Sequence, residues 1–231
     1  AGKTGFALNE ADKKNIEKAN REYLQSIKIP PDHWASYYNE GNYYLNIGNY
    51  RQAIAGYETS IRLEPQGVMS RVNMSMAYAR LGESKKAESS LKEALKIAPD
   101  SAAANLNMGL LKAEQGDRKG AERYLRQAWK ADPQMGQAAY NLCIILSESK
   151  PDEAIGWCRK ASEASPSNPK FAYSLAYYER KKGDTEAAIG TLRNLIARNP
   201  DYPDAYVLLG EIYERQGRVN EARTVYQQAL W

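Results

Sequence analysis

The sequence predicts an all-α protein built as a solenoid of helix–turn–helix repeats. Three observations indicate this: prolines recur at a nearly constant spacing, alanines recur with the same period, and apolar residues between them follow helical spacing. The prolines are Pro31, Pro65, Pro99, Pro133, Pro166 and Pro200, separated by 34, 34, 34, 33 and 34 residues. The alanines are Ala53, Ala87, Ala121, Ala154, Ala188 and Ala222. Each proline is expected to end a unit, because proline disfavours helix in the residue before it.

The repeat plan is clearest in Ala102–Pro133. Its first part, Ala103–Gln115, carries leucines at helical spacing. Gly116-Asp117 then interrupts the pattern, as expected of a turn between helices. The second part, Arg118–Lys130, again places apolar side chains on one face. We therefore expect two antiparallel helices, a first and a second, in every repeat.

The chain divides into an N-terminal part and six repeats. Residues 1–33 hold a short lead and a predicted helix, Asn9–Ile27, which keeps the register of a second helix and forms a half-repeat or cap. The repeats are expected at 34–67, 68–101, 102–135, 136–168, 169–202 and 203–231, as one continuous solenoid over 34–231. Repeat four is one residue short, so we expect a tighter turn near Ser149–Pro151.

Small residues recur where the two helices of a repeat are expected to approach closely. Position 8 of the six repeats is occupied by Gly41, Ser75, Gly109, Cys143, Ala176 and Gly210. Larger residues at position 24, such as Leu91 and Tyr226, are expected to fill the space around this contact.

The two cysteines, Cys143 and Cys158, both fall on core positions of repeat four. Buried free thiols are the favoured interpretation. A disulfide is the alternative, because the two helices face each other. Neither CxxC nor CxxCH occurs, so these metal and haem attachment motifs are absent from the sequence.

Composition and motifs favour no catalytic, cofactor or metal role. The chain has 231 residues and a net charge of +4, too small to predict nucleic-acid binding. No apolar run has the length of a membrane span, so no direct membrane insertion is expected. The single histidine, His33, has no nucleophile or carboxylate in a supporting pattern. We therefore expect a protein without enzymatic activity, metal or cofactor.

The period and the pattern of small residues resemble the tetratricopeptide repeat (TPR) family over nearly the whole chain. The resemblance implies a right-handed superhelix in which positions 2, 5, 6, 9, 12 and 13 of each first helix line a concave face. It also implies a protein or peptide partner. Four charged residues stand where the family prefers apolar ones: Glu40, Arg71, Lys112 and Glu179.

Asparagine recurs at position 6 of four repeats, although it is a poor helix former. These residues are Asn39, Asn73, Asn107 and Asn141. A carboxamide can hold both the C=O and the N–H of an extended peptide. The column resembles the asparagine ladder with which the TPR superhelix of O-linked N-acetylglucosamine transferases grips peptide backbone. The alternative is that each asparagine bonds within its own repeat stack or only faces water.

Residues at two further positions, apolar or aromatic except for Asn42, flank the asparagines and complete the expected peptide-binding set. At positions 5 and 9 these are Tyr38, Val72, Leu106, Tyr140 and Tyr173, and Asn42, Met76, Leu110, Ile144 and Tyr177. Alternatively, position 5 is merely core, packed against the next repeat. Three cations of repeat five, Lys170, Arg180 and Lys181, are candidate contacts for an acidic or phosphorylated segment. The lysine/asparagine/arginine clamp of TPR chaperone adaptors is not expected, since Tyr38 and Val72 replace its lysine.

Two functional hypotheses follow. The first is a scaffold that binds an extended peptide in the concave groove. The second is an assembly module that self-associates or stacks on a longer protein through its ends, for which Leu230 and Trp231 are the candidate contacts. The runs Ala35–Tyr50 and Ala138–Ile145 weakly resemble TPR regions of bacterial exported proteins, some joined to multihaem cytochromes. That resemblance implies a bacterial periplasmic or envelope location rather than the cytoplasm.

Overall fold

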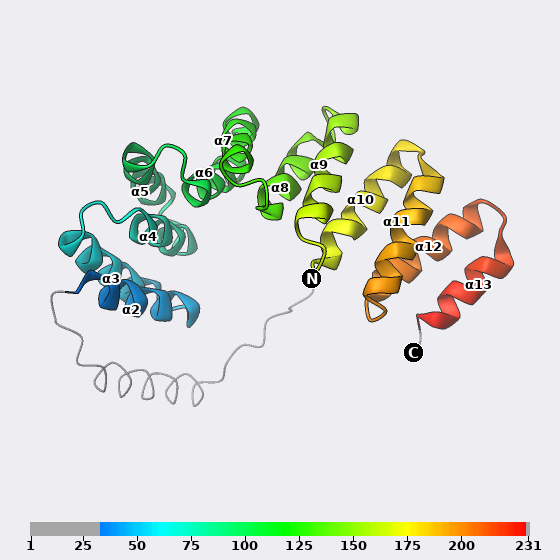
Figure 1. The fold of residues 1–231 in the computed structure, drawn as a ribbon, viewed down its shortest axis with the longest axis horizontal. Coiled ribbons are helices and arrows are strands. Elements are labelled where there is room, and N and C mark those ends of the chain that lie inside the picture. The colour runs from blue at the N-terminus through cyan, green and yellow to red at the C-terminus, as the bar shows by residue number, and fades with distance from the viewer. Residues whose placement is uncertain (1–32, 230–231) are drawn as a thin grey trace. The chain divides into compact units, whose positions relative to one another are not determined.

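The computed structural model describes residues 33–229, which form twelve α-helices and no strand (Figure 1). The predicted all-α repeat fold is confirmed. The expected leading helix, Asn9–Ile27, and the candidate contacts Leu230 and Trp231 lie outside the described residues. The chain forms two compact units, with the boundary between Ala98 and Pro99. That the six repeats form one continuous solenoid stays a prediction.

Unit 1 contains the first two repeats. Its helices are α2 (Trp34–Asn46), α3 (Tyr50–Leu63), α4 (Val68–Arg80) and α5 (Ser84–Ile97). Each helix packs against the next, and α2 also contacts α4. First helices therefore lie beside first helices within this unit.

Unit 2 contains the other four repeats. Its helices are α6 (Ala102–Glu114), α7 (Arg118–Ala131), α8 (Gly136–Leu146), α9 (Pro151–Ala164), α10 (Pro169–Lys182), α11 (Thr185–Arg198), α12 (Pro203–Arg215) and α13 (Val219–Gln228). Consecutive helices pack together, and first helices also touch at α6–α8 and α10–α12. The recurring alanines are buried in these contacts, as their period predicted.

Helix ends follow from local chemistry. Gly116 adopts a left-handed φ of 78° after α6, a conformation that glycine tolerates best. Asp117 then caps α7, because its side chain accepts a hydrogen bond from the Gly120 amide at 2.9 Å. Proline occupies the first turn of α9, α10 and α12, where its missing N–H costs nothing.

Repeat four is one residue shorter than the other full repeats, and its first helix is shortened rather than the turn between its two helices. Its first helix, α8, has 11 residues, against 13 in α6. The turn at 147–150 is not shorter than the turn at 115–117, so the predicted tighter turn is wrong. This turn has no positive-φ glycine, whereas Gly116 supplies one in repeat three. A residue removed before the turn therefore ends α8 early.

The predicted close contact between positions 8 and 24 is present inside each unit. A Cβ added to Gly41 would lie 2.6 Å from the Tyr57 ring, and one added to Gly109 would lie 2.7 Å from Leu125. At these two positions a side chain larger than glycine would clash with its partner. In repeat four the same two positions are Cys143 and Cys158, which form a disulfide with Cα atoms 5.1 Å apart. The favoured interpretation of free thiols is therefore wrong, although both cysteines are buried as expected.

Candidate functional site

The candidate site is the first-helix face of each unit, meaning positions 2, 5, 6, 9, 12 and 13 of the first helices. In unit 1 this face includes Met76, which is 38% exposed, and Met69, which is about two turns earlier on α4. Val72, expected to contact a peptide, is only 1% exposed. It packs in the core, which is the alternative considered for position 5.

Four polar side chains of unit 1 form one network. The Asn73 amide donates to Asn42 Oδ1 at 2.7 Å and to the Tyr38 hydroxyl at 3.3 Å. The Tyr57 hydroxyl also donates to Asn42 Oδ1, at 2.8 Å. Burial raises the pKa of Tyr57, so this phenol stays protonated and can donate. Both N–H groups of Asn73 are therefore used inside the repeat stack, which agrees at this residue with the alternative to a ladder.

The asparagines of unit 2 are arranged differently. Asn107 donates to the Ala103 carbonyl at 2.9 Å, and Asn141 donates to the Gln137 carbonyl at 2.7 Å. Each bond stays within one helix, from residue i to residue i−4, and uses one of the two amide hydrogens. Each side chain thus keeps its orientation and still has an acceptor oxygen and a second N–H to offer.

Apolar side chains flank these asparagines on the surface of unit 2. Ile144 is 39% exposed and Tyr177 is 37% exposed, at position 9 of successive repeats. The Tyr140 ring stacks on Phe171, with centroids 4.8 Å apart, and Lys170 Nζ lies 5.1 Å from the Tyr140 ring centroid. The remaining residues expected here, Leu106, Leu110 and Tyr173, are half-buried. Every expected contact of unit 2 therefore reaches the surface in part.

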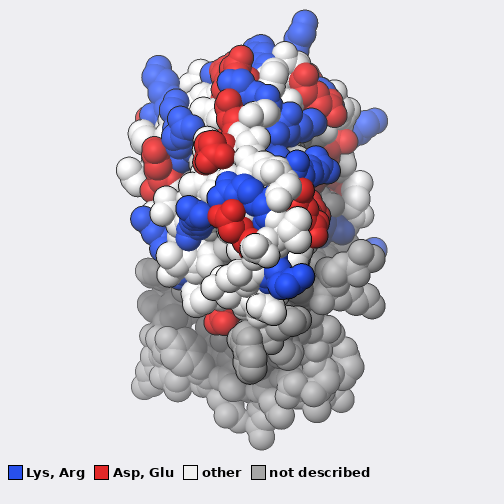
Figure 2. Space-filling view, turned by 90° about the vertical axis from the view of Figure 1, so that its right-hand side faces the viewer, with Lys and Arg blue, Asp and Glu red and all other residues white. Residues whose placement is uncertain are grey.

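The three candidate cations differ in availability. Arg180 donates to Glu211 Oε2 at 2.7 Å, so its charge is already paired. Lys170 and Lys181 are exposed. On the face shown in Figure 2, Lys and Arg side chains are intermixed with Asp and Glu.

Two of the unexpected charges have partners that explain their burial. Glu179, 2% exposed, accepts from Thr191 Oγ1 at 2.8 Å and pairs with Arg159 at 3.3 Å. Arg71 donates to the Gly67 carbonyl at 3.1 Å and lies 3.5 Å from the Glu93 carboxylate. Both therefore replace an apolar core residue by a partnered ion.

Three further observations on residues 33–229 concern metal ligands, membrane spans and the single histidine. No group of three or more His, Cys, Asp or Glu side chains in that range could hold a metal ion. None of the described helices combines the length and apolarity needed to cross a membrane. His33 is exposed and stacks on Trp34, with ring centroids 6.2 Å apart.

Comparison with known proteins places these observations in a family. Two family models, both described as tetratricopeptide repeat, match the sequence: one at residues 38–102 and 173–230, the other at 78–143. Together they span well over half of the chain. The chain belongs to the tetratricopeptide repeat family. No curated protein matches the TPR chain at the sequence level.

Solved structures share the fold of this TPR protein. PilF from Pseudomonas aeruginosa is 18% identical, with a TM-score of 0.69, over 91% of this chain and 90% of its own. PilW, described as a type IV pilus biogenesis factor, is 23% identical, with a TM-score of 0.68, over 84% and 91%. YrrB, described as a TPR protein with an unusual peptide-binding site, is 20% identical, with a TM-score of 0.56, over 82% and 95%. At these identities the likeness concerns the fold alone.

The sequence did not predict the role of Tyr57. The sequence did contain a signal for this role. Tyr57 stands at position 24, opposite Gly41, and the polar residue Asn42 follows that glycine. Because Gly41 has no side chain, the Tyr57 ring packs against it, and the Tyr57 hydroxyl hydrogen-bonds to Asn42 on the first-helix face of unit 1.

Proposed function

We propose that unit 2 binds an extended segment of a protein partner along its first-helix face, on α6, α8, α10 and α12. The observation that carries the proposal is the exposure of Ile144 and Tyr177 at the same position of successive repeats. Apolar side chains exposed in register are a feature of interaction surfaces rather than of ordinary solvent-exposed helices. The TPR fold supports a scaffold role, and a peptide-binding site is described for YrrB.

Asn107 and Asn141 are the proposed rungs of the ladder. A peptide entering the face loses water from its backbone groups and needs replacement partners. Each of these asparagines offers an unused acceptor and an unused donor from a side chain already oriented by its own helix. The apolar side chains of the segment would contact Ile144 and Tyr177.

The proposed segment carries an acidic residue near repeat five. Lys170 and Lys181 are exposed at positions 2 and 13 of α10, whereas Arg180 is already bound to Glu211. A carboxylate or phosphate on the segment would find two cations there and could displace Glu211 from a third.

The test is selection of 12-residue peptides from a randomised library on the full chain, followed by amide chemical-shift mapping of one selected peptide. Shifts concentrated on α8 and α10 are expected. Shifts concentrated on α9 and α11 would place recognition on the second helices and contradict the proposal.

The assembly hypothesis rests on Leu230 and Trp231, which lie outside the described residues. Self-association through them stays a prediction, to be checked by light scattering over a range of protein concentrations.

A further inference from the structure

Three second helices of unit 2 carry an arginine at the same register. Arg126 on α7, Arg159 on α9 and Arg193 on α11 each stand five residues after the recurring alanine of their repeat. Each therefore projects from an equivalent place toward the following repeat.

Two of these arginines are paired with carboxylates of the following repeat. Arg126 forms an ion pair with Glu153 on α9, and also binds Glu122 on its own helix at 2.7 Å. Arg159 pairs with the buried Glu179 on α10 at 3.3 Å. At this register, two of the three arginines therefore form an ion pair with the next repeat.

Arg193 has neither of these partners. The residue at the register of Glu179 is Tyr213, whose ring centroid lies 5.9 Å from the guanidinium carbon of Arg193. The residue at the register of Glu153 is Glu221. Both carboxylate oxygens of Glu221 already accept hydrogen bonds from Arg218, at 2.6 and 2.5 Å. Within residues 33–229, Arg193 forms no ion pair.

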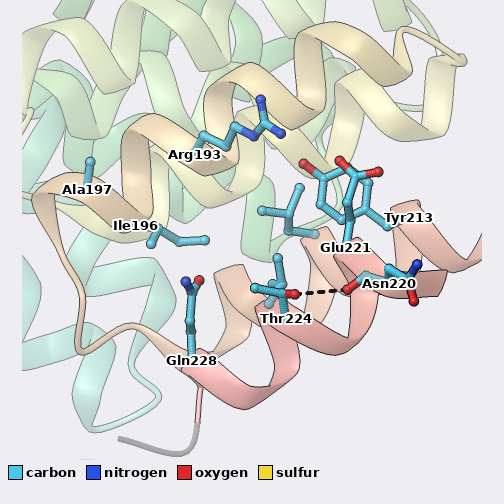
Figure 3. A pocket seen from close by; sticks show the side chains of 10 residues that line it. Arg193, Ile196, Ala197, Tyr213, Asn220, Glu221, Thr224 and Gln228 are labelled. Carbon is cyan, nitrogen blue, oxygen red and sulfur yellow. Dashed lines mark hydrogen bonds between the residues drawn. The ribbon is translucent and has the colours of Figure 1, made fainter. Parts of the chain in front are cut away.

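An open cavity of about 440 Å³ lies beside this arginine, between α11 and α13. Figure 3 shows Arg193 and Ile196 lining it from α11 and Thr224 and Gln228 lining it from α13. Its buried floor is apolar and is made by Leu209, Tyr213 and Val225. The equivalent cavity between α9 and α11, where Arg159 is paired, is about 180 Å³.

We propose that the cavity between α11 and α13 binds a small amphiphilic monocarboxylate, an aryl or medium-chain alkyl acid. Its apolar body would pack on Leu209 and Val225. Its carboxylate would accept hydrogen bonds from Arg193, as Glu179 does from Arg159. The charged side chains that line the cavity are Arg193 and Glu221, and both carboxylate oxygens of Glu221 accept hydrogen bonds from Arg218. A single negative charge therefore matches the site better than a phosphate, which Glu221 would repel.

The probe is 4-phenylbutyrate, titrated into the full chain while methyl and amide resonances are followed by NMR. We expect saturable shifts at Ile196, Leu209 and Val225 with a dissociation constant of about 1 mM, ordinary for a ligand of this size. The neutral isostere 4-phenylbutanamide should bind about tenfold more weakly. Equal binding of acid and amide, or no saturable shift at these residues, would overturn the proposal.

The matched variants are Arg193→Gln and Arg223→Gln. Both remove one exposed arginine charge, but Arg223 lies on α13 outside the lining of this cavity and lines a different pocket. Arg193→Gln should weaken binding of the acid about tenfold and leave binding of the amide unchanged, while Arg223→Gln should change neither. A loss of acid binding that is the same in both variants would show only a general charge effect and would overturn the assignment to Arg193. Amide binding also reports that the variant cavity is intact.

Discussion

Asn73 on α4 donates to Asn42 on α2 across two repeats, with Nδ2 and Oδ1 2.7 Å apart. Tyr57 on α3 donates to the same oxygen at 2.8 Å. One carboxamide therefore joins three helices of unit 1. Two residues that the sequence suggested for a ligand, Asn42 and Asn73, are bonded to each other in the structure.

Replacing Asn73 by alanine should lower the stability of unit 1. Two hydrogen bonds are lost, and the Tyr38 hydroxyl loses its donor, at a cost of about 1–2 kcal/mol in the free energy of unfolding. Hydrogen exchange of the α2 and α4 amides measures this cost. The control is Asn107→Ala, whose amide bonds only within its own helix. Equal protection in the two variants would mean that the network does not stabilise unit 1.

Removing the disulfide should destabilise repeat four. The bond between Cys143 and Cys158 closes a loop with a sequence separation of 15, worth about 3 kcal/mol in the chain-entropy account. Urea unfolding of reduced wild type should show this loss, and Cys143→Ala/Cys158→Ala should lose at least as much, because it also truncates two buried side chains. In denaturant without reductant, an alkylating reagent should label neither cysteine, and after reduction it should label both. Labelling of both without reductant would restore the free-thiol interpretation.

Acid should weaken the contact between α7 and α9 through Arg126. Hydrogen bonding by Arg126 lowers the pKa of Glu122 and of Glu153 below the ordinary value. A lowered pKa in the folded state contributes stability above the unfolded pKa of about 4.3, and this is lost as the pH falls through the folded pKa. The pairs are partly exposed, so the contribution is about 0.5–1 kcal/mol.

Urea midpoints at pH 6.5 and pH 3.5 measure this effect. The difference between the two pH values should be smaller in Arg126→Gln than in wild type, since the variant has less stability to lose. Arg223→Gln, which removes a charge from α13, should behave as wild type. An unchanged pH difference in Arg126→Gln would mean that the ion pairs contribute nothing.

The periodic features of the chain were predictable from sequence because each depends on one position repeated many times. Small residues at position 8 meet large ones at position 24, as Gly109 meets Leu125, and the recurring alanines are buried. The shortened α8 was not predictable, because one missing residue can be absorbed by a turn or by a helix end. The sequence therefore predicts which residues of a helix are buried better than it predicts where the helix ends.

The polar part of the candidate site was only partly predictable. Position 6 predicted where the asparagines lie but not what they bond, because the partner depends on neighbours in another repeat. Asn73 finds Asn42 and Tyr38 within reach, whereas Asn107 and Asn141 bond to their own helices. The core position of Val72 and the pairing of Arg180 with Glu211 depend on packing between repeats in the same way.

The most direct test of the account is the affinity of Asn107→Ala/Asn141→Ala for a 12-residue peptide selected on the wild-type chain, measured by isothermal titration calorimetry. The matched control is Asn194→Ala, an exposed asparagine on second helix α11. Each rung should contribute about 1–1.5 kcal/mol, so the double variant should bind roughly 30-fold to 150-fold more weakly, with Asn194→Ala unchanged. If the double variant binds the peptide as tightly as wild type, the asparagines serve packing alone and the ladder does not exist.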